Sequence, residues 1–453
     1  MNTKLSNHNF ITKVLIFFLK VNIFLIFLFA RTYTGLNIFG FRVGEIFIGV
    51  SILILLIYCF KYPIFNKSYL FNSKELNFTL VLLIVSFILF NIIIRQNFLD
   101  TFIYQTSVFI WSFGALFLGF YMTKVVNFKI YKYDKYLSLI GLFIIYIYST
   151  KGISENRQNY ILNFVDKFEY PKGSDLLLAF IFVFYFILKI SNFSSSSVNI
   201  LILFAALYIP LFLVKSRSGF ISLMFFLIIL FFYLKRSDFK LGKSFIFTCL
   251  FSILVFLVST TWVVSRDIVI DEDIDNEIKY AITSRYQTIN DNVYEKEVLK
   301  LKLFYFENGR IFSSDGNLNW RFQIWQDVLR DMIKEKNIIY GYGFNEIIPA
   351  INSNQRVGQD SQNINVHNYI IHIISRGGLF HLALVLVFYK NLFQIFKYKG
   401  LSVDYKLIIL PLIFNSFFDP SMENAHYPLV LFFMIGLALN NSIIFNEDNK
   451  VLN

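Results

Sequence analysis

The run NVHNYIIHIISRGGL, residues 365–379, lies where a long polar segment of the chain meets an apolar one. Residues 265–366, just before it, lack a run of about 20 mostly apolar residues, the length that a membrane-spanning helix needs. Such runs fill most of the chain on either side. We therefore predict that the molecule is organised around this polar insert and the membrane rim that it covers.

The composition of the chain indicates a protein with many membrane spans. Of its 453 residues, 56% are hydrophobic and only 16% are charged, whereas about a quarter of the residues in a soluble domain are charged. The net charge of +12 comes from short clusters of Lys and Arg between apolar runs, which does not fit a nucleic-acid binder. Cys59 and Cys249 each lie alone in an apolar run, so neither a disulfide framework nor a metal site is indicated.

We predict an all-α, polytopic transmembrane protein with about twelve spans, because the chain offers that many apolar runs. The first is read as an uncleaved span, since it is too long for the apolar core of a cleaved signal. The chain then divides into an N-terminal membrane region (1–264), one large extracytoplasmic loop before the tenth span (265–366) and a C-terminal membrane region (367–453). The predicted spans lie near residues 10–30, 40–60, 77–95, 102–122, 136–149, 176–192, 198–214, 219–234, 244–264, 369–389, 405–418 and 427–445.

The orientation follows from the basic residues of the short loops, which gather on the cytoplasmic side of membrane proteins. Alternate loops are rich in Lys, whereas the loop between the last two spans carries only the acids Asp419 and Glu423. Both termini are therefore predicted to be cytoplasmic and the large insert to lie outside. The basic loops contain Lys61–Lys74, Lys124–Lys135, Lys235–Lys243 and Lys390–Lys406.

Ionisable residues within spans are functional candidates by default, because a charge in hydrocarbon is costly. Lys13, Lys20 and Lys189 are expected to extend to a membrane interface. Arg42 and Glu45 are spaced to pair across one helical turn. Such a pair is a candidate for supporting a site.

The segment Lys215-Ser216-Arg217-Ser218-Gly219 precedes an apolar helix on the predicted outer side. A helix N-terminus offers free N–H groups and a positive dipole end, so an anion, particularly a phosphate, would bind well beside these two cations. The alternative is that a serine caps the helix while Lys215 and Arg217 lie among lipid headgroups.

An amphipathic helix is predicted from Asp315 or Asn317 to about Lys336. Its apolar stripe consists of Trp325, Val328, Leu329, Met332 and Ile333, and Arg321 lies on the same stripe. A cation there would point toward the membrane region, where a buried anionic ligand would need it. The alternative is a structural ion pair. The other face carries Gln326, Asp327, Arg330, Asp331 and Lys334.

His367 and Asn368 stand where the insert enters the tenth span. A histidine at a membrane rim can accept a proton from a hydroxyl, and Asn368 could orient it or contact a sugar; a structural role is the alternative. His372 and Arg376 follow at four-residue spacing and share a helix face. Further glycines, in Gly341-Tyr342-Gly343 and Gly377-Gly378, predict a turn, close packing or a helix break.

These motifs, in this order on such a scaffold, resemble the O-antigen ligase and O-antigen polymerase superfamily. The resemblance runs from about Val198 to Val385. It departs from the family in lacking a Pro before Gly341 and in having Arg376 where an acidic residue is common. The matching residues are Ser216, Arg217, Ser218 and Gly219; then Arg321, Trp325, Gly341 and Gly343; then His367, Asn368, Gly377 and Gly378.

The resemblance implies a C-type glycosyltransferase fold in the bacterial inner membrane, with the active site facing the periplasm. The implied reaction is a metal-independent, inverting transfer, without cofactor, of a glycan from undecaprenyl pyrophosphate to an acceptor sugar. His367, Arg217 and Arg321 would be catalytic, the histidine as general base and the arginines against the departing pyrophosphate. Substrate binding would involve Lys215, Ser218, Trp325 and Asn368.

The nature of the acceptor separates the two activities of the superfamily. A ligase uses a lipid A core sugar and a polymerase a second lipid-linked glycan, and the order of the motifs with the long insert favours the ligase. Membrane lipids and a chain-length regulator protein are further expected partners. A flippase or transporter for lipid-linked sugars is the alternative from another class. It is less favoured because the cations gather at one rim and the sequence shows no internal repeat.

Overall fold

The computed structural model describes residues 2–44, 46–47, 49–50, 53, 73–91, 108, 112–125, 132–165, 168–236, 243–264, 304–313, 316–345, 347–352 and 363–439. Several predictions lie outside these residues: most of the second span, the partner Glu45 of Arg42, Cys59, and residues 265–303 of the insert.

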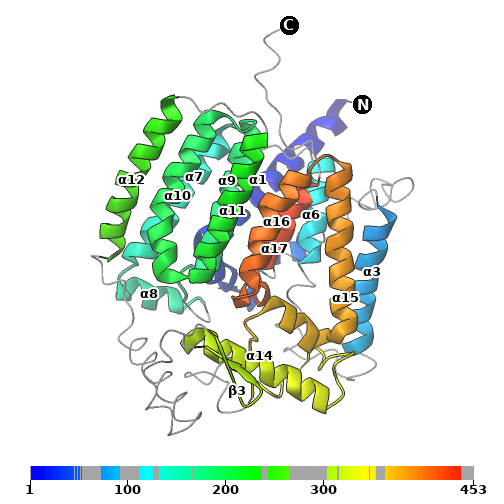
Figure 1. The fold of residues 1–453 in the computed structure, drawn as a ribbon. Coiled ribbons are helices and arrows are strands. Elements are labelled where there is room, and N and C mark those ends of the chain that lie inside the picture. The colour runs from blue at the N-terminus through cyan, green and yellow to red at the C-terminus, as the bar shows by residue number, and fades with distance from the viewer. Residues whose placement is uncertain are drawn as a thin grey trace.

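Most described helices run side by side as one bundle (Figure 1). They are α1 (Asn2–Thr34), α3 (Lys74–Leu89), α6 (Phe113–Val125), α7 (Lys132–Lys151), α9 (Gly173–Ile190), α10 (Ser195–Lys215), α11 (Arg217–Arg236), α12 (Lys243–Val264), α15 (Tyr369–Tyr398), α16 (Ser402–Ser416) and α17 (His426–Ala438).

Six helices in the described part are long and apolar enough to cross a membrane: α9 to α12, α15 and the Phe17–Thr34 stretch of α1. A seventh results if α7 and the short helix α8 (Glu155–Leu162), bent by 108° to it, form one span. The prediction of a polytopic helical membrane protein is confirmed. The count of about twelve spans stays a prediction.

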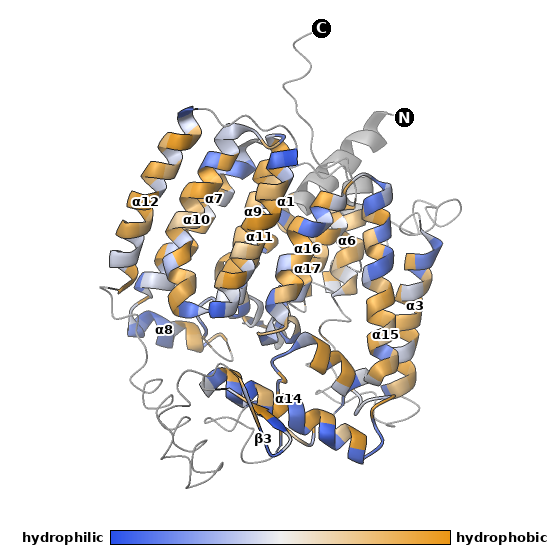
Figure 2. Ribbon diagram, viewed as in Figure 1, coloured by the Kyte–Doolittle hydropathy of each residue, from blue (hydrophilic) through white to orange (hydrophobic). Residues whose placement is uncertain are grey.

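Helix α9 is the centre of the bundle. Within its apolar window 83% of the residues are buried, against 17% in α12 at the edge. The edge helices carry exposed apolar side chains, among them Phe247, Leu250 and Leu254 of α12, and apolar colour runs along the bundle helices in Figure 2. Lipid must cover such a surface, because large apolar patches are not stable in water. The site described below forms at the N-terminal end of α9.

Helix α14 (Gly316–Lys334) lies across the end of the bundle as an amphipathic helix (Figures 1 and 2). Its bounds agree with the predicted helix, and Ile324, Val328 and Met332 are buried at four-residue spacing. The predicted stripe was wrong at Ile333, which is 66% exposed. This residue follows Met332 and is therefore turned by about 100° around the helix axis.

The opposite face of α14 is covered by a hairpin of β3 (Tyr305–Glu307) and β4 (Arg310–Phe312). Arg310 pairs with Asp327, and Gln326 accepts the N–H of Ile311 at 2.8 Å. A second hairpin joins β1 (Asn37–Ile38) to β2 (Phe41–Arg42). The described residues therefore contain two short hairpins in addition to the predicted helices. The predicted start of the second span, at residue 40, falls within the β1–β2 hairpin.

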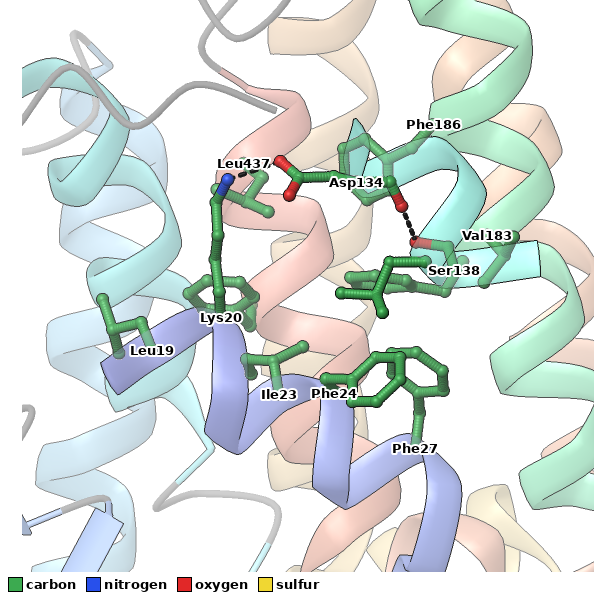
Figure 3. A pocket seen from close by; sticks show the side chains of 13 residues that line it. Leu19, Lys20, Ile23, Phe24, Phe27, Asp134, Ser138, Val183, Phe186 and Leu437 are labelled. Atoms are coloured by element: carbon green, nitrogen blue, oxygen red, sulfur yellow. Dashed lines mark hydrogen bonds and ion pairs between the residues drawn. The ribbon is translucent and has the colours of Figure 1, made fainter. Parts of the chain in front are cut away.

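Two of the intramembrane lysines have acidic partners rather than only extending to an interface. Lys189 lies 2.5 Å from the buried carboxylate of Asp404. Lys20 pairs with Asp134 at one side of an apolar pocket between α1, α7, α9 and α17 (Figure 3). Pairing lowers the cost of placing each charge near hydrocarbon. The side chain of Lys13 lies outside the described residues.

Helix α15 is interrupted at Gly378, which has a φ of 69°. Residues 338–343 dock at this interruption. The N–H of Leu379 donates to Ile338 O (2.9 Å), and the N–H of Tyr342 donates to Ser375 O (2.7 Å). The backbone groups that the interruption frees are thereby paired within the protein, as a lipid environment demands.

The predicted close approach at Gly341 is confirmed, since a Cβ there would lie 2.5 Å from the backbone of Arg376. The predicted helix break is confirmed by the non-helical backbone of Gly378. The predicted tenth span, residues 369–389, lies within α15, which is broken at Gly378 and continues to Tyr398.

Replacing Gly378 by Ala is expected to destabilise the fold by more than the backbone cost alone. A Cβ there would lie 2.0 Å from Ile339 O. Gly400 is the matched control, because its φ of 72° is similar but its Cβ would meet no atom within 4 Å. Gly400→Ala should show the conformational cost of about 1–3 kcal/mol. Thermal unfolding in detergent measures both variants, and equal losses would contradict this account of the docking.

Candidate functional site

The Lys215–Gly219 motif packs against the beginning of α9. A Cβ at Gly173 would lie 2.1 Å from the Cβ of Ser216, and Lys215 Nζ donates to Pro171 O at 3.4 Å. The contact places the junction of α10 and α11 beside the N-terminus of the central helix, on the side of the bundle where α14 lies (Figure 1).

Within this motif Ser216 acts as a cap. Its hydroxyl accepts the N–H of Gly219 at 3.1 Å and lies 3.0 Å from the hydroxyl of Ser218. Arg217, the first residue of α11, is exposed. The capping alternative thus describes Ser216, while anion binding by Lys215, Arg217 and Ser218 stays a prediction.

Arg321 extends from α14 to the loop between α16 and α17, where its Nη1 donates to Phe418 O. The next residue, Asp419, is the N-cap of the short 3₁₀ helix η5 (Pro420–Glu423). Burial raises the pKa of Asp419 to about 6, although the charges of Arg321 and Lys172 lower it. Arg321 therefore points toward the membrane region, as predicted, and lies among ionisable groups from α9 and η5.

His367 lies next to this cluster and is held on several sides. Its ring packs edge-on against Trp320 of α14, with centroids 5.0 Å apart. Trp325, five residues further along α14, donates its indole N–H to Val366 O at 2.9 Å. The N–H groups of Val366 and His367 donate to the two carboxylate oxygens of Glu423, at 3.1 and 3.0 Å. Trp325 thus fixes the loop that carries the histidine.

The protonated nitrogen of His367 follows from its neighbours. Asn363 Oδ1 accepts the N–H of Asn365 at 3.1 Å, so this atom is the amide oxygen, and His367 Nε2 lies 3.1 Å from it. Nε2 must then donate its hydrogen, which leaves the lone pair of the neutral ring on Nδ1. Nδ1 is buried and has no hydrogen-bond partner among the described residues.

Burial lowers the pKa of His367 to about 3, and the charges of Arg321 and Lys172 add to that effect against the opposing carboxylate of Glu423. The ring is therefore neutral at neutral pH. A neutral imidazole with a free lone pair is the form in which a histidine can accept a proton.

Asn368 is the N-cap of α15. Its Oδ1 accepts the N–H of Ile371 at 3.0 Å, and its Nδ2 donates to Phe417 O at 2.9 Å. Both groups act within the protein and tie the start of α15 to the end of α16. A sugar contact by Asn368 stays a prediction.

The two residues that follow on the same face have different surroundings. Arg376 is 1% exposed and donates to Gly343 O at 3.3 Å, so it supports the docked turn. His372 Nδ1 lies 3.3 Å from the carboxylate of Glu423. The positive residue at position 376 therefore lies in the helix break and not against His367.

Sequence reasoning missed the acidic residues of the site. Asp419 and Glu423 were used there only as acids that mark an outer loop. Asp175, which lies 2.7 Å from His426, was not singled out. Lys172, the N-cap of α9, was missed as well. The one available signal was that the two loop acids lie on the same predicted side as the insert. No spacing links residue 423 to residue 367.

The fold and the site together define a multipass helical membrane protein that gathers ionisable residues at the end of its bundle where α14 lies. Residues 200–386 match the family of proteins described as O-antigen ligase. The predicted resemblance to that superfamily is confirmed. The match includes the Lys215–Gly219 motif, α14 and the break in α15. No curated protein matched the chain.

Arg321→Gln is expected to raise the pKa of His367, because the Arg321 charge is one of the causes that lower it. The pKa of Asp419 should rise as well, since a nearby cation favours its ionised form. Titration of ¹⁵N-labelled histidines by NMR measures the first effect, with the His367 signal assigned by its loss in His367→Ala. Arg310→Gln, which removes a cation of β4 that pairs with Asp327 on the outer face of α14, is the control. An unchanged His367 titration would contradict the coupling.

Proposed function

We propose that the protein transfers a glycan from undecaprenyl pyrophosphate to an acceptor sugar at the periplasmic face of the bacterial inner membrane, as an O-antigen ligase does. The observation that supports this most is the electrostatic proximity of Arg321 and His367 within the region that matches the O-antigen ligase family. One supplies a positive charge and the other a neutral base, which are the two functions that such a transfer needs.

The departing pyrophosphate carries several negative charges, so the site must offer cations. Arg321 and Lys172 act electrostatically on the same groups, and Lys215 contacts the segment before α9. Arg217 begins the neighbouring helix. Arginine binds phosphate oxygens with two parallel N–H groups, which suits Arg321 and Arg217 to this task. Neutralising charge as it develops on the leaving group lowers the barrier.

His367 would take the proton of the acceptor hydroxyl on Nδ1. The hydroxyl oxygen then forms a bond to the anomeric carbon while the bond from that carbon to the pyrophosphate oxygen breaks, and the leaving group keeps the electron pair. A single displacement of this kind inverts the anomeric centre and calls for neither a metal ion nor a cofactor. Pyrophosphate bound beside Arg321 and Lys172 would offset their charges, which makes His367 a stronger base once donor is present.

The acceptor is proposed to be a lipid A core sugar, in keeping with the description of the matched family. A lipid-linked glycan would instead make the protein a polymerase with the same donor and site. The cytoplasmic location of both termini follows from the basic loops and belongs to this proposal. The proposal also assigns substrate binding to Trp325 and Asn368. A chain-length regulator protein is a further proposed partner.

The test is an assay with purified protein in nanodiscs, a matched lipid-linked oligosaccharide and rough lipopolysaccharide, with products followed by mass spectrometry. Glycan on the lipopolysaccharide identifies a ligase, whereas longer lipid-linked chains without lipopolysaccharide identify a polymerase. If the donor crosses the bilayer intact and neither product forms, the protein is a transporter and the proposed reaction is wrong.

His367→Ala should lower the transfer rate by about 10²–10⁴-fold, the usual contribution of a general base. Arg321→Ala should be similarly impaired because the leaving group loses a cation. Arg330→Ala is the matched control on α14, since Arg330 donates to Gly309 O in the exposed hairpin. Wild-type transfer by His367→Ala, at an equal amount of folded protein, would refute the proposed reaction.

A further inference from the structure

Glu423 accepts hydrogen bonds directly from the backbone that carries the candidate base, His367. Its two carboxylate oxygens accept the consecutive N–H groups of Val366 and His367, at 3.1 and 3.0 Å. The carboxylate is 3% exposed, and the ring nitrogen Nδ1 of His372 lies 3.3 Å behind it. Hydrogen bonds from N–H groups to an ionised carboxylate are about twice as strong as those between neutral groups.

The backbone of His367 has an unfavourable conformation that needs such hydrogen bonds to maintain it. Its φ of 59° lies in the left-handed region, which residues other than glycine seldom adopt. Holding a residue in so sparsely populated a conformation costs about 1–3 kcal/mol, and it persists only when the surroundings impose it. The conformation directs the ring against Trp320 and toward Asn363.

The surroundings of Glu423 favour the ionised form of its carboxylate. Burial raises its pKa, but His372 and the N–H of Val366 act in the opposite direction and hold the pKa below the usual value. The residue sits at the end of η5, in the connection between α16 and α17. It therefore joins the last membrane helices to the loop that leaves the insert, across a separation of 56 residues along the chain.

We propose that Glu423 is a positioning residue for glycan transfer, which holds His367 in its left-handed conformation so that the ring faces the acceptor hydroxyl. His372 supports the carboxylate from behind. Glu423 touches neither donor nor acceptor in this account and acts only through His367. The proposal rests on the proposed function, in which His367 is the base.

The first test is Glu423→Gln in the nanodisc assay. The amide keeps the size of the side chain but turns one hydrogen-bond acceptor into a donor that opposes an N–H group. A displaced base is expected to lower kcat by about 10²-fold. The KM for the lipid-linked donor should change by less than about threefold, because the cations that hold it remain. Glu423→Asp, which keeps the charge on a shorter side chain, should recover part of the loss and serves if the Gln variant folds poorly.

The matched control is Asp404→Asn. Asp404 is also a buried carboxylate, 2% exposed, which accepts from Tyr185 and pairs with Lys189. Those partners lie near the far end of α9, whose N-terminal end forms the site. This variant should lower the melting temperature with little effect on kcat.

The decisive test repeats Glu423→Gln in the His367→Ala background. Residues that act through one another are not additive, so the second substitution should cause no further loss. An equal loss in both backgrounds, or wild-type kcat in Glu423→Gln alone, overturns the proposal. Wild-type activity in His367→Ala overturns the proposed function and this proposal together, so the two failures are distinguishable.

A readout independent of turnover is the ¹⁵N resonance pair of the His367 ring. Glu423→Gln should shift it, whereas Asp404→Asn should leave it in place. This measurement tests the proposal if the His367→Ala variant has too little residual activity for the two backgrounds to be compared. An unshifted ring signal in Glu423→Gln overturns the proposal.

Discussion

The pairing of backbone groups at the interruption of α15 is the constraint on which the rest of the site depends. In a membrane each unpaired N–H or C=O costs several kcal/mol, so a helix can break only where another segment takes up the freed groups. Residues 338–343 do so here, and the approach is close enough that Gly341 and Gly378 leave no space for a side chain. The polar insert is thereby attached to the membrane region at a defined point.

That attachment sets the position of α14 and of the loop before α15. The small apolar core of Ile324, Val328 and Met332 closes over Tyr342 and Val366, so the helix, the docked turn and the histidine loop share one set of contacts. Arg321 and Trp325 extend from the same helix toward η5 and Val366. A single packing arrangement therefore fixes both the charge and the base of the candidate site.

The end of the bundle combines cations with buried acids, and burial governs their charge states. Asp419 is only weakly acidic for an aspartate because burial outweighs the nearby cations. His367 is neutral because burial and two cations disfavour its protonated form. An anionic ligand would alter both balances, since it would neutralise the cations that Asp419 and His367 share. The charge states of Asp419 and His367 are therefore coupled to any anion that lies beside these cations.

The sequence by itself determined the parts of this protein that depend on local pattern. Runs of apolar residues specify helices such as α9 and α10, the spacing of Ile324, Val328 and Met332 specifies an amphipathic helix, and the glycine pairs mark the turn and the break. Only the tertiary structure decided that Glu423 clamps His367, that Ile333 faces outward and that Asn368 and Arg376 act within the protein. The physical reason is that periodicity reports which face of one element is buried. Which residues meet across the bundle depends instead on how α15, α16 and α17 return to the same rim, and no spacing along the chain encodes that.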